Sequence, residues 1–174
     1  MLVNWLFFGL DTIGFSGSRS LSGAGLAALT SLFPLVPIGC HVCVGCAAGA
    51  DAAVRDAFTN CGRVCLFSVS SGRWGVGRAA FARRSAAIVE AVPSGGLMVV
   101  VPSGACPAGV VPSRSFSGCG SGSWGSAALA LGKGRQVLLW LPTGSVPPVW
   151  AGVSWSAVGD WWLGVSGSSQ LSMF

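Results

Sequence analysis

The sequence predicts one α/β domain built around a mostly parallel sheet of five or more strands. Short apolar runs alternate with helix-like stretches, which is the pattern of βαβ units. Over half of the 174 residues are hydrophobic and 9% are charged, as expected when strands are covered on both faces. Glycine- and serine-rich turns follow several strand-like runs. A chain of this length can bury a sizeable core in one domain.

The individual elements follow from composition and breakers along the chain. Strands are predicted at 12–15, 41–45, 63–69, 97–101 and 136–141. Helices are predicted at 21–33, 50–58, 78–92 and 124–131. A long Pro/Gly/Ser-containing loop, 102–122, separates the fourth strand from the last helix. Loops of this length within a compact domain are usually functional or mobile.

Two extensions flank a predicted core domain at 12–141. Residues 1–11 form an apolar N-terminal extension, and residues 142–174 form a C-terminal extension rich in Trp, Gly and Ser. The C-terminal extension is expected to add an edge strand or hairpin, or to cover a sheet face. Its tryptophans are expected to pack on the domain; the alternative is a self-association surface, and we expect a homo-oligomer.

No membrane or secretory segment is predicted. No apolar run reaches the roughly 18–20 residues of a spanning helix, and the N-terminus lacks a basic region and a cleavage site. We therefore expect a cytoplasmic protein with free thiols and no membrane partner. Cys40, Cys43 and Cys46 form a C-x-x-C-x-x-C run without the usual fourth cysteine, and His41 is the single histidine. No metal site and no cofactor are predicted.

The charge of the chain favours an anionic ligand. The formal net charge is +5, and Lys133 is the single lysine, so arginine supplies nearly all the positive charge. The arginine fork matches phosphate oxygens, although solvated surface arginines are an equally good interpretation.

Three glycine-rich turns each lead from a predicted strand toward a helix, where backbone N–H groups favour anions. In the first turn, Gly17, Ser18 and Arg19 are candidate phosphate ligands. In the second, Gly45, Gly49 and Asp51 are candidates, with Asp51 as helix cap or ribose acceptor. The third supplies Gly120, Ser121, Gly122 and Ser123. The first turn by itself is equally well interpreted as a plain strand-to-helix connection, and for Asp51 in the second turn helix capping is the favoured single role.

The sequence leaves open the role of Trp124 and the orientation of two adjacent arginines. Trp124 is a candidate for stacking on a base or for filling the core. Arg83 and Arg84 are adjacent in a predicted helix, so they project about 100° apart and one of them is expected to point into the cleft.

Together these segments resemble the SLOG superfamily of Rossmann-like domains, which includes the DprA (Smf) and Lonely Guy proteins. The segment 44–53, VGCAAGADAA, looks like the DprA S-G-x-A-x-G-I-D-x-x-A motif, and FARRSAAI at 81–88 is similar to F-x-x-R-N-R-x-I. The first turn and the 120–124 loop resemble the family's GSR start and S-G-[ST] loop. The resemblance covers about 12–141, implies a Rossmann-like three-layer sandwich, and favours Arg83 as the ligand-facing arginine.

The departures from that pattern bear on activity. Lonely Guy proteins use a glutamate after their phosphate loop, whereas this chain has Ser126 and Ala127 where that acid is expected. The resemblance therefore implies a domain that binds a nucleotide or nucleotide-derived ligand, without that phosphoribohydrolase activity. A DprA-like protein that binds single-stranded DNA is the alternative. An enzyme acting on nucleosides or nucleotides, with Asp51 or Glu90 as its acid, is the second alternative.

Overall fold

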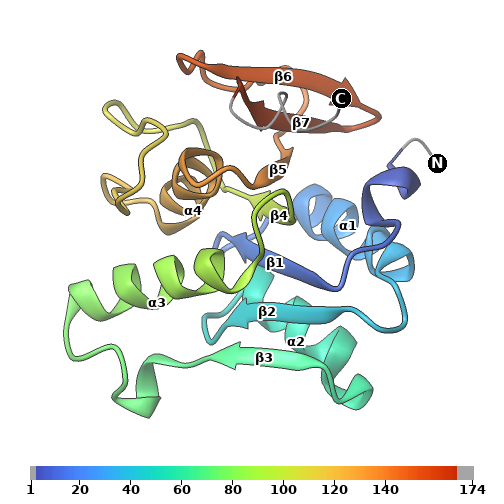
Figure 1. Cartoon of the computed structure of the whole chain (residues 1–174), viewed down its shortest axis with the longest axis vertical. Coiled ribbons are helices and arrows are strands. Elements are labelled where there is room, and N and C mark those ends of the chain that lie inside the picture. The colour runs from blue at the N-terminus through green and yellow to red at the C-terminus, as the bar shows by residue number, and fades with distance from the viewer. Residues whose placement is uncertain (1–2, 168–174) are drawn as a thin grey trace.

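The computed structural model describes residues 3–167. Its centre is a seven-stranded sheet with the strand order β3-β2-β1-β4-β5-β7-β6 (Figure 1). The strands β1 to β5 run parallel, and β7 and β6 add antiparallel to β5. The α/β class and the mostly parallel sheet are therefore confirmed, with a mixed sheet because of the C-terminal hairpin.

The strands are β1 (Thr12–Gly17), β2 (His41–Gly45), β3 (Val64–Phe67), β4 (Leu97–Val101), β5 (Gln136–Trp140), β6 (Val153–Val158) and β7 (Trp161–Ser166). The helices are α1 (Gly23–Ser31), α2 (Ala50–Phe58), α3 (Arg78–Ala91) and α4 (Gly122–Gly132). Two strands and one helix, β2, β4 and α2, match the predicted bounds. The first helix is shorter than predicted because Phe33–Leu35, which contains Pro34, forms a separate 3-10 turn.

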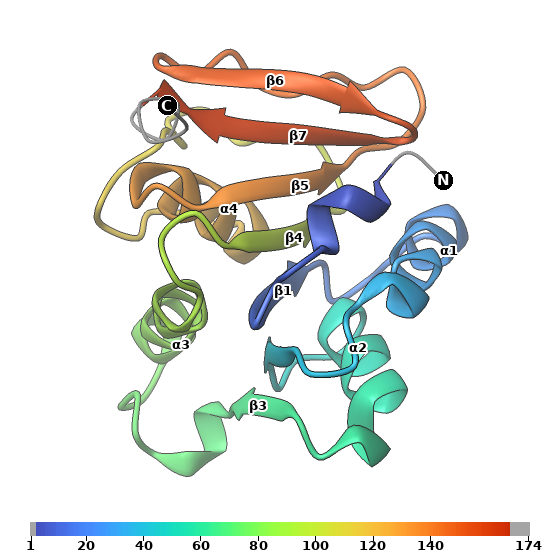
Figure 2. The same cartoon turned by 45° about the vertical axis from the view of Figure 1, so that its right-hand side comes forward.

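The sheet is the middle of three layers, and an apolar core lies between it and the helices on each face. One core joins the sheet to α1 and α2, through residues such as Leu29 and Val54. The other joins it to α3 and α4, through residues such as Ile88 and Leu129. Figure 2 shows the two helix pairs on opposite sides of the sheet. All five residues of β4 are buried, as a strand covered on both faces requires.

The C-terminal extension forms the β6–β7 hairpin as far as the described residues reach. Trp161 and Leu163 on β7 are buried in the first core, and Trp150, which precedes the hairpin, is buried in the second. The described tryptophans of this extension thus contribute to the domain. Residues 168–174, which were included in the predicted extension, lie outside the described residues.

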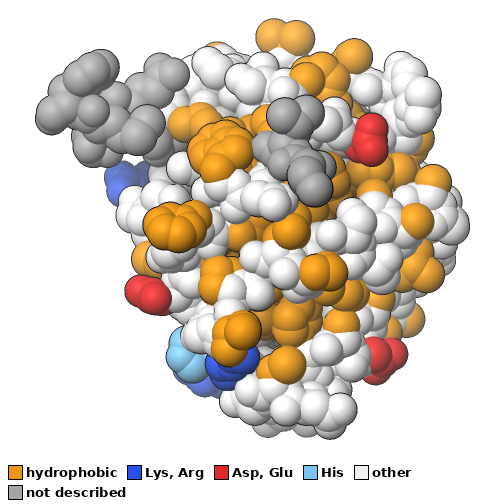
Figure 3. Space-filling view, turned by 90° about the vertical axis from the view of Figure 1, so that its right-hand side faces the viewer, with side chains coloured by type: hydrophobic (Ala, Val, Ile, Leu, Met, Phe, Trp, Pro, Cys, Tyr) orange, Lys and Arg blue, Asp and Glu red, His pale blue; other side chains and the backbone are white. Residues whose placement is uncertain are grey.

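The N-terminal extension is only partly buried. Leu6 and Phe7 in the 3-10 turn Asn4–Phe7 (η1) pack into the first core, while Trp5 and Phe8 are exposed. Figure 3 views the side that carries this turn and α1, where apolar side chains outnumber charged ones. Among the described residues, no helix is long and apolar enough to cross a membrane.

Candidate functional site

A cleft of about 950 Å³ opens where β1 and β4 end. This is the point at which the strand order reverses, since β2 lies on one side of β1 and β4 on the other. In open α/β sheets such a switch point forms a crevice beyond the carboxyl ends of the strands. Most of the predicted site residues line this cleft. They are Gly17, Ser18, Arg19, Asp51, Gly120, Ser121, Gly122 and Ser123.

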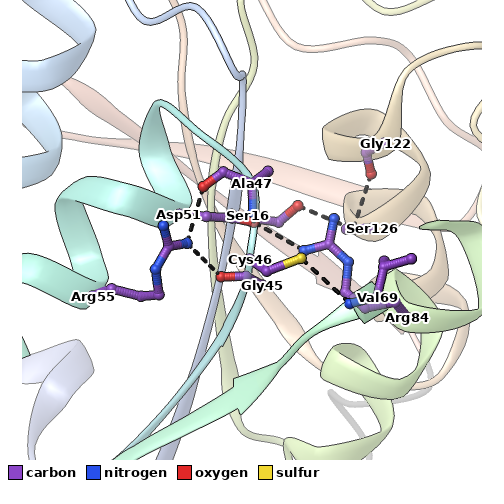
Figure 4. Close-up of polar contacts among 10 residues, drawn as sticks. All are labelled: Ser16, Gly45, Cys46, Ala47, Asp51, Arg55, Val69, Arg84, Gly122 and Ser126. Atoms are coloured by element: carbon purple, nitrogen blue, oxygen red, sulfur yellow. Dashed lines mark hydrogen bonds and ion pairs between the residues drawn. The ribbon is translucent and has the colours of Figure 1, made fainter. Parts of the chain in front are cut away.

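A buried ion pair forms one wall of the cleft (Figure 4). Arg84 Nη1 lies 2.9 Å from Asp51 Oδ2, and both residues are less than a tenth exposed. The same Asp51 oxygen accepts a hydrogen bond of 3.1 Å from the backbone N–H of Ala47. Asp51 therefore organises the second loop and neutralises Arg84. The Arg84 Nε atom is buried and has no hydrogen-bond partner among the described residues.

The two predicted glycines of the second loop do not line the cleft but permit its geometry. A side chain at Gly45 would occupy the space of the Arg84 guanidinium. Gly49 has φ +68° and crosses the first loop so closely that a Cβ atom would meet the Ser18 carbonyl oxygen. The N–H of Ala50 donates a hydrogen bond of 3.0 Å to that same oxygen. The two loops are thus locked together through backbone atoms.

Arg55 holds the second loop from the opposite side. Its Nη1 donates hydrogen bonds of 2.8 Å to the Gly45 carbonyl and 2.9 Å to the Ala47 carbonyl (Figure 4). Because Arg55 lies on α2, these hydrogen bonds tie the second loop to the helix that follows it. Arg55 is a structural arginine that sequence reasoning did not single out.

The first loop presents Arg19 at the edge of the cleft. The Ser18 hydroxyl is engaged with the backbone of Ser20, which shapes a tight turn. The exposed Arg19 guanidinium carbon lies 4.9 Å from the centre of the Phe81 ring on α3. This cation–π contact orients a planar cation at the cleft opening.

The third loop begins α4 on the far side of the cleft. The Ser121 side chain caps the helix by accepting from the Trp124 N–H at 3.4 Å, and it lies 3.2 Å from the Ser123 hydroxyl. The first turn of a helix leaves backbone donors free and carries partial positive charge. Two neutral hydroxyls and a helix N-terminus therefore face Arg19 and Arg84 across the cleft.

The position expected to hold an acid in a hydrolase is occupied by a structural serine. Ser126 is buried, receives a hydrogen bond of 3.1 Å from the Ser16 hydroxyl and donates one of 2.9 Å to the Gly122 carbonyl. These contacts fix the start of α4 to the end of β1 (Figure 4). Ala127, the alternative position, is fully buried.

Two of the predicted site residues lie elsewhere. The arginine in the cleft is Arg84 and not Arg83, whose Nε donates to the Trp74 carbonyl oxygen at 2.6 Å on the other side of α3. The indole of Trp124 is 2% exposed, donates to the Gly104 carbonyl at 2.9 Å and packs edge-on against Trp150. Stacking on a base needs an open ring face, so Trp124 is a core residue.

Several residues that line the cleft were not among the predicted ligand-binding residues. Two of them carry side chains suited to a ligand: Phe81, and Arg78, which was expected to line a groove only in the single-stranded DNA alternative. Arg78 and Phe81 line the cleft and are exposed. Their spacing of three residues places both on one face of α3, and this spacing was the signal that would have found them.

The cysteines are separate free thiols. Among the described residues, no group of three or more Cys, His, Asp or Glu side chains is placed to hold a metal ion. Burial, with the nearby Asp11 charge, raises the pKa of Cys40 to about 11. Burial and the adjacent Cys65 raise the pKa of Cys43 to about 12. Burial alone would also raise the pKa of Cys46, but hydrogen bonds from Val69 N–H and Ser68 and the charge of Arg84 outweigh it and lower this pKa.

The fold and the cleft define a Rossmann-like α/β protein with a crevice at its topological switch point. No family model and no curated protein sequence matches the chain. A solved structure of DNA processing protein A from Helicobacter pylori, a protein described for its mode of binding single-stranded DNA, is similar in fold. The TM-score is 0.57 at 12% sequence identity, and the match covers 82% of this chain and 71% of the other.

Proposed function

We propose that the protein is a binding module for a nucleotide or a nucleotide-derived ligand, whose phosphate lies in the cleft. The observation that carries this proposal is the charge of the cleft. Arg19, Arg78 and Arg84 line it together with the N-terminus of α4, while its one lining acid, Asp51, is already paired with Arg84. Such a surface suits an anion held by guanidinium and backbone N–H groups.

The same observation argues for binding without turnover. Cleavage of a ribosyl bond needs a positioned acid or base. Asp51 is engaged by Arg84 and by the Ala47 N–H. Ser126 and Ala127 stand where the resemblance to Lonely Guy proteins would place the glutamate. Incubation with nucleoside monophosphates is therefore expected to release no free base.

Calorimetric titration with a nucleoside monophosphate tests the proposal. The wild-type protein should bind it, and should bind the matching nucleoside, which lacks the phosphate, far more weakly. Arg19→Gln should weaken binding about tenfold, because it removes one charge-assisted hydrogen bond. Arg63→Gln changes the same charge at the amino end of β3 and serves as the control. Equal affinity for nucleoside and nucleotide would contradict the proposal.

A second candidate is binding of single-stranded DNA, and the fold of the Helicobacter pylori protein favours it. The phosphate-binding chemistry of the cleft suits a nucleotide within a strand as well as a free one. Titration with an oligonucleotide distinguishes the two, since strand binding falls steeply with salt concentration.

A further inference from the structure

An uncharged surface lies over η1 and α1, on the α1 side of the sheet. Residues 3–10 and 20–40 contain no charged side chain. Both segments contribute to the first core, and η1 and α1 lie side by side in Figures 1 and 2. Directly after these segments the backbone joins them, since the His41 N–H donates a hydrogen bond of 2.8 Å to the Asp11 carbonyl oxygen. Two uncharged stretches that are distant in sequence thus form one surface, which we call the apolar face.

Four large apolar side chains are exposed on the apolar face. Phe8 is 92% exposed, Ile38 90%, Trp5 63% and Leu26 42%. Figure 3 views this side of the molecule. Given the usual size of an aromatic side chain, Trp5 and Phe8 alone present roughly 300 Å² of surface. The largest apolar patch of a typical monomer is about 300–600 Å² and is often functional, so the apolar face has the size of an interaction site.

The outer side of α1 differs from that of a solvated helix. Gly25 and Leu29 are its buried residues, but Leu26 and Ala27 on its outer side are also apolar and are exposed. A surface helix usually carries charged and polar residues on its outer side, whereas a helix that is apolar all round is buried. The neighbouring α2 follows the usual pattern, with Asp56 exposed. The composition of α1 therefore indicates that a partner covers its outer side.

A second copy of the chain fits the apolar face better than a charged partner does. The face offers no charged group to a nucleic acid, an acidic peptide or an anionic lipid headgroup. Each copy has a net charge of +5, and contact through an uncharged surface brings no like charges together. The centre of a protein interface is depleted in charged residues and enriched in aromatic ones. A twofold axis uses the same surface on both copies, so one such face is sufficient.

The area of the apolar face is compatible with a dimer. A stable interface buries about 800 Å² on each partner, of which a polar rim forms part. The four large side chains supply most of the apolar centre. The exposed serines and threonine of α1, Ser22, Thr30 and Ser31 with its N-cap included, supply a rim.

We propose that the protein forms a twofold-symmetric dimer through the apolar face, with Trp5, Phe8 and Ile38 at the buried centre. No residue of 3–10 or 20–40 lines the cleft, so both clefts stay open in the dimer and the inference does not depend on the proposed function. The self-association surface therefore lies at η1 and α1. The tryptophans Trp150 and Trp161 of the C-terminal extension are buried in the domain.

Sedimentation equilibrium of the full chain tests this interface. The wild type should reach twice the 17.5 kDa mass of the chain, with a dissociation constant below about 10 µM. Phe8→Asp and Ile38→Asp should each raise that constant at least about thirtyfold, because each places a carboxylate without a partner in the buried centre. Val76→Asp and Val149→Asp are the matched controls, since they change equally exposed valines outside the apolar face and should leave the constant unchanged.

The other outcomes overturn the dimer. A wild type that is monomeric at every concentration overturns it, and so does a dimer that Phe8→Asp and Ile38→Asp weaken no more than the controls do. A monomer that binds neutral phosphatidylcholine vesicles would identify a lipid surface as the occupant. A monomer that loses thermal stability in both aspartate variants would identify the chain itself as the occupant. If Ile38→Asp alone unfolds, Phe8→Asp still decides the question. A dimeric wild type that binds no nucleoside monophosphate overturns the proposed function and leaves the dimer intact.

Discussion

The Arg84 guanidinium crosses directly over Gly45 to reach Asp51, with 2.9 Å between Nη1 and Oδ2. This ion pair joins α3 to the second loop and fixes the charge of the cleft wall. It leaves the buried Arg84 Nε without a hydrogen-bond partner among the described residues.

Replacement of Asp51 by alanine should destabilise the protein strongly. Arg84 would remain buried without its carboxylate, and breaking a buried ion pair from one side costs about 3–5 kcal/mol. Chemical denaturation of Asp51→Ala and of Asp56→Ala measures this cost. Asp56 is exposed on the same helix and forms no ion pair within residues 3–167, so its variant should stay within about 0.5 kcal/mol of wild type. Similar losses in the two variants would contradict the structural role of the pair.

Replacement of Gly49 by alanine should affect both stability and ligand binding. The residue has φ +68°, and a Cβ atom would press on the Ser18 and Arg19 carbonyls. We expect a loss of about 2 kcal/mol or more and weaker nucleotide binding, because the first loop must move. Gly62→Ala is the control, since Gly62 has φ +64° but open space around it. It should lose some stability and keep wild-type affinity; if Gly49→Ala also keeps wild-type affinity, the crossing of the two loops does not position the site.

Replacement of Trp124 by phenylalanine should lower stability without altering ligand affinity. The indole is buried against Trp150 and donates to the Gly104 carbonyl, so the smaller ring leaves a partial cavity that costs about 2 kcal/mol. Denaturation and nucleotide titration of the same variant separate the two effects. A large loss of affinity in a variant of normal stability would restore the stacking role predicted from the sequence.

The central parallel strands were predictable because burial on both faces leaves a continuous apolar run. Leu97–Val101 consists of apolar residues only and is buried throughout. The C-terminal hairpin was less certain, since its strands mix Ser, Gly and Trp, and their burial depends on pairing of β7 with β5.

The cleft was predictable in its loops but not in its side chains. Glycine-rich turns after parallel strands must gather at one edge of the sheet, and the residues of all three turns do meet there. The choice between Arg83 and Arg84 depends on the rotation of α3 about its axis, which packing on the sheet decides. The role of Trp124 also depends on tertiary packing. From the sequence its ring fits a core or a ligand platform equally well, and its contact with Trp150 places it in the core.

Among the cysteines with a displaced pKa, Cys46 should be the one that reacts with iodoacetamide at the lowest pH. Its pKa is lowered by the Val69 N–H, Ser68 and Arg84 against the effect of burial, whereas the pKa values of Cys40 and Cys43 are raised. A thiol with a lowered pKa holds more thiolate at neutral pH, and the thiolate is the nucleophile. Labelling across a pH series, read for each cysteine by mass spectrometry, should give Cys46 a midpoint below pH 9 and leave Cys40 and Cys43 unlabelled there.

Ser68→Ala provides the control for the cause of this shift. It removes one hydrogen bond to the sulfur and keeps the hydrogen bond from the Val69 N–H and the charge of Arg84, so the Cys46 midpoint should move to higher pH while the fold is retained. A Cys46 midpoint at or above pH 9 in the wild type, or one that Ser68→Ala leaves in place, would mean that burial outweighs these contacts.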